Sequence, residues 1–409
     1  MTINKRVLYI SYDGMTDPLG QSQVIPYLQQ LTKYGYQFTI LSVEKKKQFQ
    51  VSGEKTRYLL SDMGIRWETL NFSKHPPVIS KLFDQWRLNI KAASLYRQQK
   101  FDLIHCRSYV AAATAIKLLY KFHVPFLFDM RGFWVDERVD SRHWNLNNPF
   151  YKILYKLYKK KEKTYFSKSA HIITLTQKGK DELIESYSVP LEKITVIPCC
   201  ADLDHFDYKN VSDQEKKNAK EKLGISDDQK VISYLGSLGG WYMTDEMLDF
   251  FAVMKKRIPE SKLLFITKDN KEQIIKKAFI RGISEKDILV QPATRNEVPL
   301  YLSVSDWSVF FIKDVYSKKA SSPTKQGEIM GMGIPIICND IGDTGYIIKD
   351  TNSGFITEGF SLIEYNKIVD NLERLKTINR SDIRDGAFHY FDLQNGVADY
   401  RKAYEKILQ

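Results

Sequence analysis

The sequence contains no long hydrophobic run. No stretch reaches about 18 consecutive apolar residues, the length at which a segment becomes a candidate for spanning a membrane. The chain also passes from Lys5 and Arg6 directly into a short strand-like run, without the apolar core and cleavage site of a secretory signal. These absences predict an intracellular, cytoplasmic protein.

Cysteine is scarce as well. The four cysteines, Cys106, Cys199, Cys200 and Cys338, lack the spacing of metal ligands, and neighbours in the chain such as Cys199 and Cys200 rarely bridge each other. Cysteines inside apolar runs of an intracellular protein are expected to be reduced thiols. We therefore expect no metal site at these cysteines.

A dinucleotide fingerprint and internal repeats are also missing. The loop after the first expected strand, residues 13–22, carries Gly14 and Gly20 without the G-x-G-x-x-G spacing, which argues against a dehydrogenase. A glycine-bearing loop that leads into a helix can still let a phosphate approach the backbone. The alternative interpretation is an ordinary strand-to-helix turn.

The chain does have an excess of positive charge. With 61 Lys and Arg against 49 Asp and Glu, its formal net charge is +12. Such a charge favours an acidic partner, which is a nucleic acid, an anionic membrane or a phosphorylated substrate. Composition does not choose among the three.

Strand-like runs alternate with amphipathic helical stretches, which indicates βαβ units and parallel sheets. Because 409 residues exceed the usual size of a single core, we predict an α/β protein with two Rossmann-like domains, residues 1–205 and 206–390. A last helix within 391–409 is expected to cross back to the first domain. The first helix is expected at 22–33, and the strands at 6–12, 38–43, 102–106, 126–130, 171–175, 194–198, 231–235, 262–267, 287–290, 307–312 and 335–338.

Residues 321–337 have the pattern of an anion-binding helix start followed by a buried strand. Ser322 suits an N-cap and Pro323 suits the first helical position, so the amides that follow would face an anion. Lys325 and Glu328 are three residues apart and share one helix face. A cation for a diphosphate and a carboxylate for ribose hydroxyls would then line one pocket. The alternative is an ordinary capped helix with a surface ion pair.

Polar residues follow two strands of the first domain. His105 and Arg107 end one strand, and Asp129 and Arg131 end the next. Since ligands of parallel sheets bind beyond the carboxyl ends of the strands, these side chains are candidates for catalysis and binding. The alternative is that Asp129 and Arg131 form a structural ion pair and that His105 is a hydrogen-bonded core residue.

Residues 150–168 predict a helix rich in tyrosine and lysine, with apolar residues at i, i+3 and i+4 spacing. Such a helix can lie on an anionic membrane surface. A packed helix with a solvated basic face explains the pattern equally well. Basic and aromatic residues also suit single-stranded nucleic acid, but one helix without a sheet platform argues against it, and we expect no nucleic-acid partner.

Three features together resemble the retaining glycosyltransferases of family 4, which have the GT-B fold of two Rossmann-like domains around a central cleft. They are the loop at residues 13–20, the run 194–198 with the Asp202 and Phe206 that follow it, and the motif from Ser322 to Glu328 before 333–337. The resemblance runs over nearly the whole chain.

The resemblance assigns the ribose hydroxyls of the donor to Glu328, which matches the second Glu of the family's E-x7-E motif. Ala320 replaces the first Glu, and Ser237 and Tyr242 stand where the family usually has the Arg and Lys that neutralise the diphosphate. Lys325, helped by a further lysine, would have to carry that charge. The candidates for this second cation are Lys268, Lys318 and Lys319.

The site residues predicted in this way fall into three groups. The predicted catalytic residues are Asp129, Arg131 and His105. The predicted donor-binding residues are Glu328, Lys325, Ser322, Pro323, Thr324, Gly236, Ser237, Lys268 and Gly20. The predicted acceptor-binding residues are Gly14, Arg107 and Trp134.

The resemblance implies an enzyme that moves a sugar from a nucleoside diphosphate sugar to a glycan or lipid-linked acceptor with retained configuration, without a metal and without a cofactor other than the donor substrate. Its expected setting is bacterial surface polysaccharide synthesis, peripheral on the inner face of the cell membrane. Two alternatives stay open. One is a nucleotide-sugar 2-epimerase, with Asp129, His105 and Glu137 as acid and base candidates. The other is a sugar-nucleotide binding protein without turnover, which Ala320 suggests.

Overall fold

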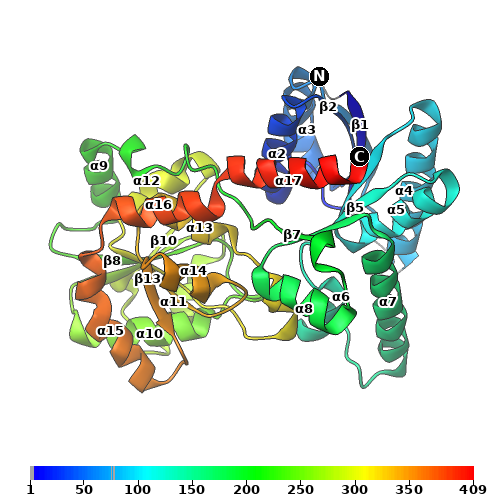
Figure 1. Ribbon diagram of the computed structural model, residues 1–409. Coiled ribbons are helices and arrows are strands. Elements are labelled where there is room, and N and C mark those ends of the chain that lie inside the picture. The colour runs from blue at the N-terminus through cyan, green and yellow to red at the C-terminus, as the bar shows by residue number, and fades with distance from the viewer. Residues whose placement is uncertain (1–3, 75, 77–78) are drawn as a thin grey trace. The chain divides into compact units, whose positions relative to one another are not determined.

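The computed structural model describes residues 4–74, 76 and 79–409. The chain divides into two compact units (Figure 1), each built on one parallel sheet with helices packed on it. Unit 1 comprises Met1–Pro198, Lys319–Ser321 and Leu393–Gln409, and unit 2 comprises Cys199–Lys318 and Ser322–Asp392. The predicted fold class, α/β with two Rossmann-like parallel-sheet domains, is confirmed.

The sheet of unit 1 has seven parallel strands in the order β3-β2-β1-β4-β5-β6-β7, the strand order of a doubly wound dinucleotide fold extended by one strand. The chain reverses direction across the sheet between β1 and β4, so the loops after these two strands meet at the same edge. The strands are β1 (Lys5–Ser11), β2 (Tyr36–Glu44), β3 (Arg66–Asn71), β4 (Leu103–Arg107), β5 (Phe126–Asp129), β6 (His171–Thr174) and β7 (Ile194–Val196).

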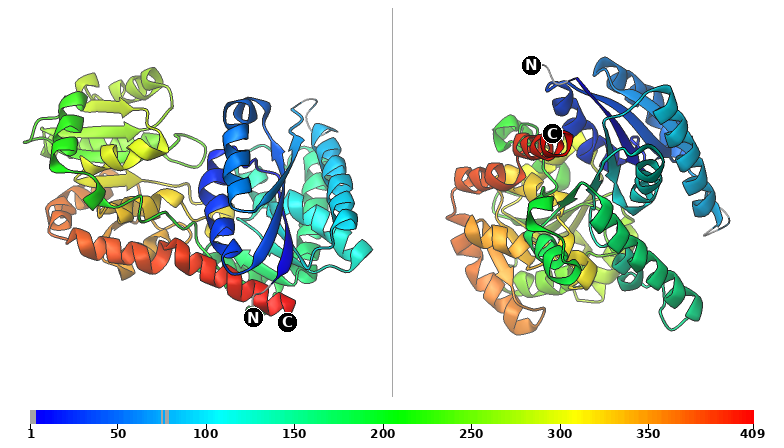
Figure 2. Two further views of the ribbon diagram at one scale, coloured as in Figure 1. Left: turned by 90° about the horizontal axis from the view of Figure 1, so that it is seen from above. Right: turned by 45° about the vertical axis from the view of Figure 1, so that its right-hand side comes forward.

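Helices cover both faces of this sheet, and Figure 2 (left) shows α2 and α3 on one side of the strands and α4 and α5 on the other. The last helix, α17, packs against α2, where the rings of Tyr27 and Tyr400 meet edge to face. The helices of unit 1 are α1 (Pro18–Gln23), α2 (Ile25–Thr32), α3 (Lys46–Asp62), α4 (Ile79–Gln98), α5 (Ser108–Phe122), α6 (Trp134–Asp140), α7 (Pro149–Lys168), α8 (Gln177–Tyr187), the 3₁₀ turn η1 (Leu191–Lys193) and α17 (Leu393–Leu408).

The sheet of unit 2 has six parallel strands in the equivalent order β10-β9-β8-β11-β12-β13. Its switch of direction lies between β8 and β11, so the loop after β8 is a place where a ligand of this fold is expected. The strands are β8 (Lys230–Leu235), β9 (Ser261–Ile266), β10 (Ile288–Gln291), β11 (Trp307–Phe310), β12 (Ile336–Asn339) and β13 (Gly354–Thr357).

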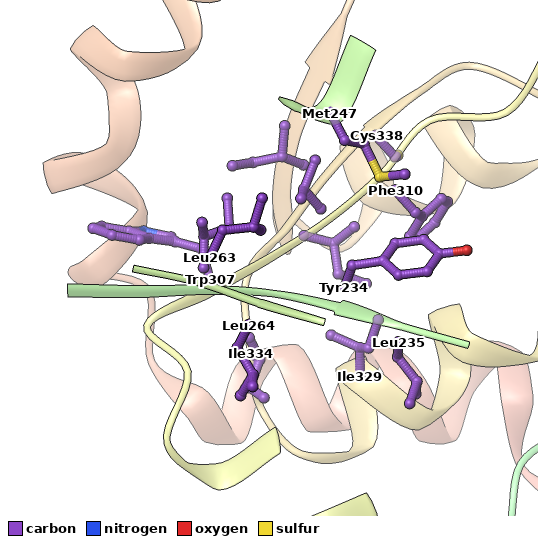
Figure 3. Close-up of a cluster of buried hydrophobic side chains, with 14 of the residues drawn as sticks. Tyr234, Leu235, Met247, Leu263, Leu264, Trp307, Phe310, Ile329, Ile334 and Cys338 are labelled. Atoms are coloured by element: carbon purple, nitrogen blue, oxygen red, sulfur yellow. The ribbon is translucent and has the colours of Figure 1, made fainter. Parts of the chain in front are cut away.

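Apolar side chains project from both faces of this second sheet, because both faces are covered by helices. In Figure 3, Met247, Phe310 and Cys338 lie on one side of the strands, and Leu264 and Ile334 lie on the other. The helices and 3₁₀ turns of unit 2 are η2 (Tyr208–Asn210), α9 (Asp213–Leu223), α10 (Thr244–Arg257), α11 (Lys271–Phe279), η3 (Glu285–Asp287), η4 (Arg295–Glu297), α12 (Val298–Ser303), α13 (Thr324–Gly331), α14 (Thr344–Asp350), α15 (Leu362–Lys376) and α16 (Arg380–Phe391), and the turn η5 (Tyr316–Ala320) runs from unit 2 into unit 1.

Two strands, β3 and β13, were not predicted. Each is an edge strand of its sheet and is only partly buried, and neither carries the continuous apolar run that marks the inner strands. The predicted helix at 22–33 is also wrong in its bounds, because the structure has two helices that meet at Val24. Pro26, at the start of α2, has no amide hydrogen with which to continue α1.

The division between the units lies at Pro198 rather than at residue 205. Ala201, Leu203 and Phe206 belong to the core of unit 2, so the segment after β7 packs with the second sheet. All four cysteines are buried and unbridged. Within the ranges that the structure describes, no helix combines the length and apolarity that a membrane span requires, and no cluster of side chains could hold a metal ion.

Candidate functional site

Helix α13 of unit 2 carries the predicted donor motif. It begins at Thr324, with Pro323 in the cap position, so the prediction that Ser322 is the N-cap is wrong by one residue. The hydroxyl of Ser322 instead accepts a hydrogen bond from the backbone amide of Cys199 at 3.1 Å. Ser322 therefore fixes the approach to the helix, and Pro323 and Thr324 form its first turn.

Lys325 is buried inside unit 2, with 7% of its surface exposed. Its Nζ lies 4.1 Å from the ring centroid of Tyr234 and 3.5 Å from that of Tyr242. Gly236 borders it on a third side, in the loop after β8, because a Cβ added there would lie 3.1 Å from Nζ. Since Gly236 also has a φ of +109°, only glycine is readily accommodated beside this amine.

The Lys325 amine has no hydrogen-bond partner among the described residues. Burial lowers its pKa well below the ordinary value, and the carboxylate of Glu328 on the same helix opposes the shift. A buried amine without a hydrogen bond is costly for the folded protein, whichever protonation state it adopts. An anion bound beside Nζ would supply the missing partner.

Glu328 lies one turn further along α13, with 13% of its side chain exposed. Burial raises the pKa of this carboxyl, although Arg295 and Lys325 oppose the shift. The Nη1 of Arg295 lies 3.3 Å from Oε1 of Glu328. Arg295 is itself held, because its guanidinium lies over the ring of Phe206 and its carbonyl contacts the ring nitrogen of His205. The carboxylate is thus oriented from outside its own helix.

Two further predicted donor residues of unit 2, Ser237 and Lys268, follow the strands β8 and β9. The carbonyl of Ser237 accepts from the hydroxyl of Tyr234 at 2.5 Å, so this residue braces one wall of the Lys325 pocket. The carboxylate of Asp269 accepts from the amide of Leu238 and fixes the loop. Lys268 follows β9 and is exposed.

The lysines and the alanine at 318–320 have defined surroundings. The Nζ of Lys318 lies 4.0 Å from the ring centroid of Trp241 in unit 2, and Lys319 pairs with Glu182 in unit 1 at 2.8 Å. Ala320 is fully buried in unit 1, where a Cβ added to Gly179 would lie 2.8 Å from its methyl group. A glutamate side chain does not fit at position 320 without rearrangement.

The glycine loop of unit 1 is already occupied by a carboxylate of the protein. Buried Glu44, at the end of β2, accepts hydrogen bonds from the amides of Met15 and Thr16 and from the hydroxyl of Thr16. A Cβ added to Gly14 would lie 2.5 Å from this carboxylate, and one added to Gly20 would lie 2.3 Å from the carbonyl of Gly14. Both glycines are therefore needed for close packing inside the loop.

The predicted catalytic residues of unit 1 do come together at the ends of β4 and β5. The Oδ2 of Asp129 lies 3.6 Å from both Nε2 of His105 and Nη1 of Arg107, and Arg131 approaches Oδ1 at 3.6 Å. Helix α17 completes the cluster from the other side. Its Tyr400 hydroxyl donates to Asp129 at 3.1 Å, and its Tyr404 hydroxyl lies 2.6 Å from Nδ1 of His105.

The ionisation of this cluster follows from its burial. Desolvation lowers the pKa of His105, which keeps the imidazole neutral at pH 7. Desolvation alone would raise the pKa of Asp129, but Arg131, His105 and Arg107 outweigh it and lower the value to about 2. The contacts with α17 favour the interpretation that His105 is a hydrogen-bonded core residue. Arg131 has a φ of +60°, a left-handed conformation that is uncommon for a non-glycine residue.

Trp134, predicted to bind the acceptor, lies in an aromatic cluster of unit 1. Its ring stacks on Tyr109 with centroids 5.8 Å apart and meets Trp144 edge to face. The guanidinium of Arg138 lies 4.9 Å from its centroid. This packing gives Trp134 a structural role, whatever else it contacts.

The sequence did not reveal the residues from distant segments of the chain that contact Lys325 and Glu328. Tyr234, Tyr242 and Arg295 come from segments far from α13 in the chain, and only the fold brings them together. The available signal was weak: Tyr242 lies in the glycine-rich segment after β8, and Arg295 follows a strand end. Glu44 has the same origin, since it ends β2 and reaches a loop that precedes it.

Comparison with known proteins bears on this site. A family model described as Glycosyltransferase Family 4 matches residues 24–205, and one described as Glycosyl transferases group 1 matches residues 215–388. The two matches together take in most of both units.

Two curated relatives are similar at low identity. A D-inositol 3-phosphate glycosyltransferase from Jonesia denitrificans is 20% identical over 63% of this chain and 59% of its own. The lipopolysaccharide glucosyltransferase WaaG of Escherichia coli is 22% identical over 56% of this chain and 59% of its own. The chain thus spans less than two thirds of the length of these relatives.

Solved structures are similar over nearly the whole chain. A glycosyltransferase from Rickettsia africae superimposes with a TM-score of 0.74 at 15% identity, covering 99% of both chains. The Anabaena protein HepE, solved in complex with UDP and glucose, gives 0.70 at 14% identity over 98% of this chain and 99% of its own. At these identities the likeness establishes the fold alone, which is GT-B.

The surroundings of Lys325 predict that Lys325→Met stabilises the protein. A methionine fills the same apolar space without a buried amine, so the free energy of unfolding should rise by roughly 1–3 kcal/mol at pH 7. The folded-state pKa of Lys325 is depressed, so the unfolded chain binds more protons below the ordinary value of 10.5. Wild-type stability therefore recovers as pH rises towards that value, and the gain of the variant shrinks.

Denaturant unfolding at pH 7 and at pH 9.5 measures this difference, with Lys268→Met, at an exposed lysine, as the control that should change nothing. A Lys325→Met protein that is less stable than wild type at pH 7 would show that the amine has a stabilising partner.

Proposed function

Because the chain belongs to glycosyltransferase family 4, we propose that it transfers a sugar from a nucleoside diphosphate sugar to an acceptor hydroxyl with retention of anomeric configuration. The observation that carries this proposal is the pairing of Lys325 and Glu328 on one face of α13. One is a buried amine beside a helix start, and the other is a carboxylate held by Arg295. Their chemistries match the two polar parts of a nucleoside diphosphate.

Lys325 would act on the leaving group. In the transfer, the bond between the anomeric carbon and the diphosphate oxygen would break, the bond to the acceptor oxygen would form, and the proton of the acceptor hydroxyl would pass to the leaving diphosphate. Negative charge grows on the diphosphate as the first bond breaks. An ammonium at Lys325 and the backbone amides of the first turn of α13 would stabilise that charge, a contribution that is usually the largest in such catalysis.

Glu328 would accept hydrogen bonds from the ribose hydroxyls. Its carboxylate keeps some exposed surface, whereas its other contacts come from Arg295 on a separate loop. A hydrogen bond to a charged acceptor contributes about 1.5–3 kcal/mol. This is enough to favour a nucleotide over fragments that lack the ribose. Position 320 offers no carboxylate, so the group that faces the transferred sugar must come from backbone or from another residue.

The setting of the reaction belongs to the same proposal. The relative WaaG is named for lipopolysaccharide, and HepE was solved with UDP and glucose. These names support a donor of the nucleoside diphosphate class and a role in bacterial surface polysaccharide synthesis, with a glycan or lipid-linked acceptor. The lysine-rich helix α7 supports a place on the cytoplasmic face of the membrane. The absence of a metal requirement stays a prediction.

Nucleotide affinity tests the pocket before any acceptor is known. We expect one member of the series UDP, GDP, ADP and dTDP to bind in calorimetric titrations. Glu328→Ala should weaken the binding of that diphosphate and of its parent nucleoside by the same factor, tenfold or more. A tenfold loss corresponds to about 1.4 kcal/mol of binding free energy. Lys325→Met should leave the affinity for the nucleoside unchanged. It should remove most of the additional affinity that the diphosphate group gives the nucleoside diphosphate over the nucleoside.

The matched control is Glu373→Ala, which removes an exposed carboxylate of unit 2. It should leave every affinity unchanged. If no diphosphate binds, or if Glu328→Ala binds as wild type does, α13 is a structural helix and the transferase proposal loses its main support.

The fate of a bound nucleotide sugar separates the possible functions. Slow hydrolysis without an acceptor should release a sugar whose first NMR signals show the anomeric configuration of the donor, because retention is proposed. The reaction should persist in the presence of a chelator. Release of the opposite anomer would contradict retention, and loss of activity with the chelator would contradict independence from metals.

The two alternative functions predict different products in the same incubation of protein and sugar nucleotide. A 2-epimerase would convert the sugar nucleotide to its C2 epimer with no acceptor present. A binding protein would leave the donor unchanged after prolonged incubation, despite measurable affinity.

A further inference from the structure

Helix α4 turns an apolar face away from unit 1. Leu82, Trp86 and Ile90 follow one another at four-residue spacing with Phe83 beside them, and all four are exposed; Trp86 keeps 56% of its surface. We name these four residues the α4 stripe. The opposite face of the helix packs inward through Ser80, Asp84, Leu88, Ala92 and Leu95.

A row of large apolar residues on the outward face of a helix does not fit a water-exposed position. Ordinary surface helices place charged residues where the α4 stripe lies. Single exposed apolar residues need no explanation, but a continuous row on one helix marks an interaction surface. Among the described residues of this chain, none covers the α4 stripe, so the stripe is a candidate interaction surface.

The α4 stripe is rigidly presented. The rings of Phe83 and Trp86 stack with centroids 5.8 Å apart, and the guanidinium of Arg87 lies 5.5 Å from the centroid of Phe83. On the inward face, the carboxylate of Asp84 accepts from the hydroxyl of Tyr12 at 3.0 Å. A stripe of fixed geometry can bind without the entropic cost of being ordered first.

Helix α7 repeats the pattern with more charge. Phe150, Ile153 and Leu157 are exposed at i, i+3 and i+7 and form a second apolar row. Helix α5 packs against both α4 and α7, so the three helices form one layer of unit 1 (Figures 1 and 2). The face of α7 beside its apolar row consists of exposed lysines, Lys152, Lys156, Lys160 and Lys163.

The charge beside the apolar rows of α4 and α7 indicates which kind of partner this surface binds. A second copy of the chain would bring lysine rows of equal sign together, on a protein whose net charge is already +12. Aromatic and aliphatic side chains flanked by lysines match the boundary of an anionic bilayer, where rings lie among the acyl chains and ammonium groups meet phosphates.

We propose that the α4 stripe is a membrane-insertion surface and that α4 and α7 together dock unit 1 on an anionic lipid bilayer. This inference deepens the membrane partner of the proposed function and rests on that function for its purpose. Tyr12 directly precedes the loop with Asp13 and Gly14, and it contacts the inward face of α4. The predicted acceptor loop would then lie on the inward side of the helix that contacts the bilayer.

Vesicle binding in the absence of nucleotide tests this surface. The wild type should sediment with vesicles of phosphatidylethanolamine and phosphatidylglycerol and far less with phosphatidylcholine vesicles. Its tryptophan emission should shift to shorter wavelength on binding. In Trp86→Phe, which keeps the apolar surface, binding should persist and most of the shift should vanish.

The double variant Leu82→Ser/Trp86→Ser should lose at least tenfold in partitioning to anionic vesicles. Both side chains face solvent, so the fold is expected to stay intact, and an unchanged melting temperature checks this. The matched control is Phe279→Ser/Ile280→Ser, which removes two exposed apolar residues at the end of α11 in unit 2. The control should bind vesicles as the wild type does.

Three results would overturn the proposal. The wild type remains in the supernatant with anionic vesicles, or the double variant and the control bind equally. In the third, light scattering finds a wild-type dimer that the double variant lacks, which would assign the α4 stripe to a second copy. None of these results depends on nucleotide affinity, so failure here leaves the transferase proposal standing, and failure of nucleotide binding leaves this one standing.

Discussion

The amine of Lys325 lies against the rings of Tyr234 and Tyr242, on a residue that keeps only 7% of its surface exposed. Within the described part of the chain nothing hydrogen-bonds to it. The folded protein therefore carries an unfavourable interaction that a hydrophobic residue would remove at once. A ligand anion at this amine, as proposed, would recover the missing hydrogen bonds and favour the charged form of the amine.

The two units treat their glycine loops in opposite ways. In unit 1 the loop after β1 presents its amides to Glu44, a carboxylate of the protein, so this anion-binding position is filled during folding. In unit 2 the loop after β8 borders the unsatisfied amine of Lys325 through Gly236. One loop satisfies its polar groups without a ligand, and the other borders an amine that has no hydrogen bond among the described residues. The asymmetry explains why nucleotide binding is proposed for unit 2 and not for unit 1.

Sequence periodicity predicted the features that depend on neighbours in the chain. The inner strands are buried on both faces and carry apolar runs, and Lys325 and Glu328 share a face because helix geometry requires it. Edge strands β3 and β13 lack such runs and were missed. The tyrosines around Lys325, the arginine beside Glu328 and the carboxylate in the unit 1 loop come from distant segments. Only tertiary packing determines those contacts, and no spacing rule encodes them.

The most direct test of this account is the pKa of Lys325 itself, measured by NMR of a ¹³C-labelled lysine side chain and assigned with Lys325→Met. The account predicts a pKa well below 10.5 in the free protein, because burial disfavours the ammonium. It further predicts an upward shift when the cognate nucleoside diphosphate binds. A Lys325 pKa near 10.5 that does not change when the nucleotide binds would contradict the claim that this amine binds the diphosphate.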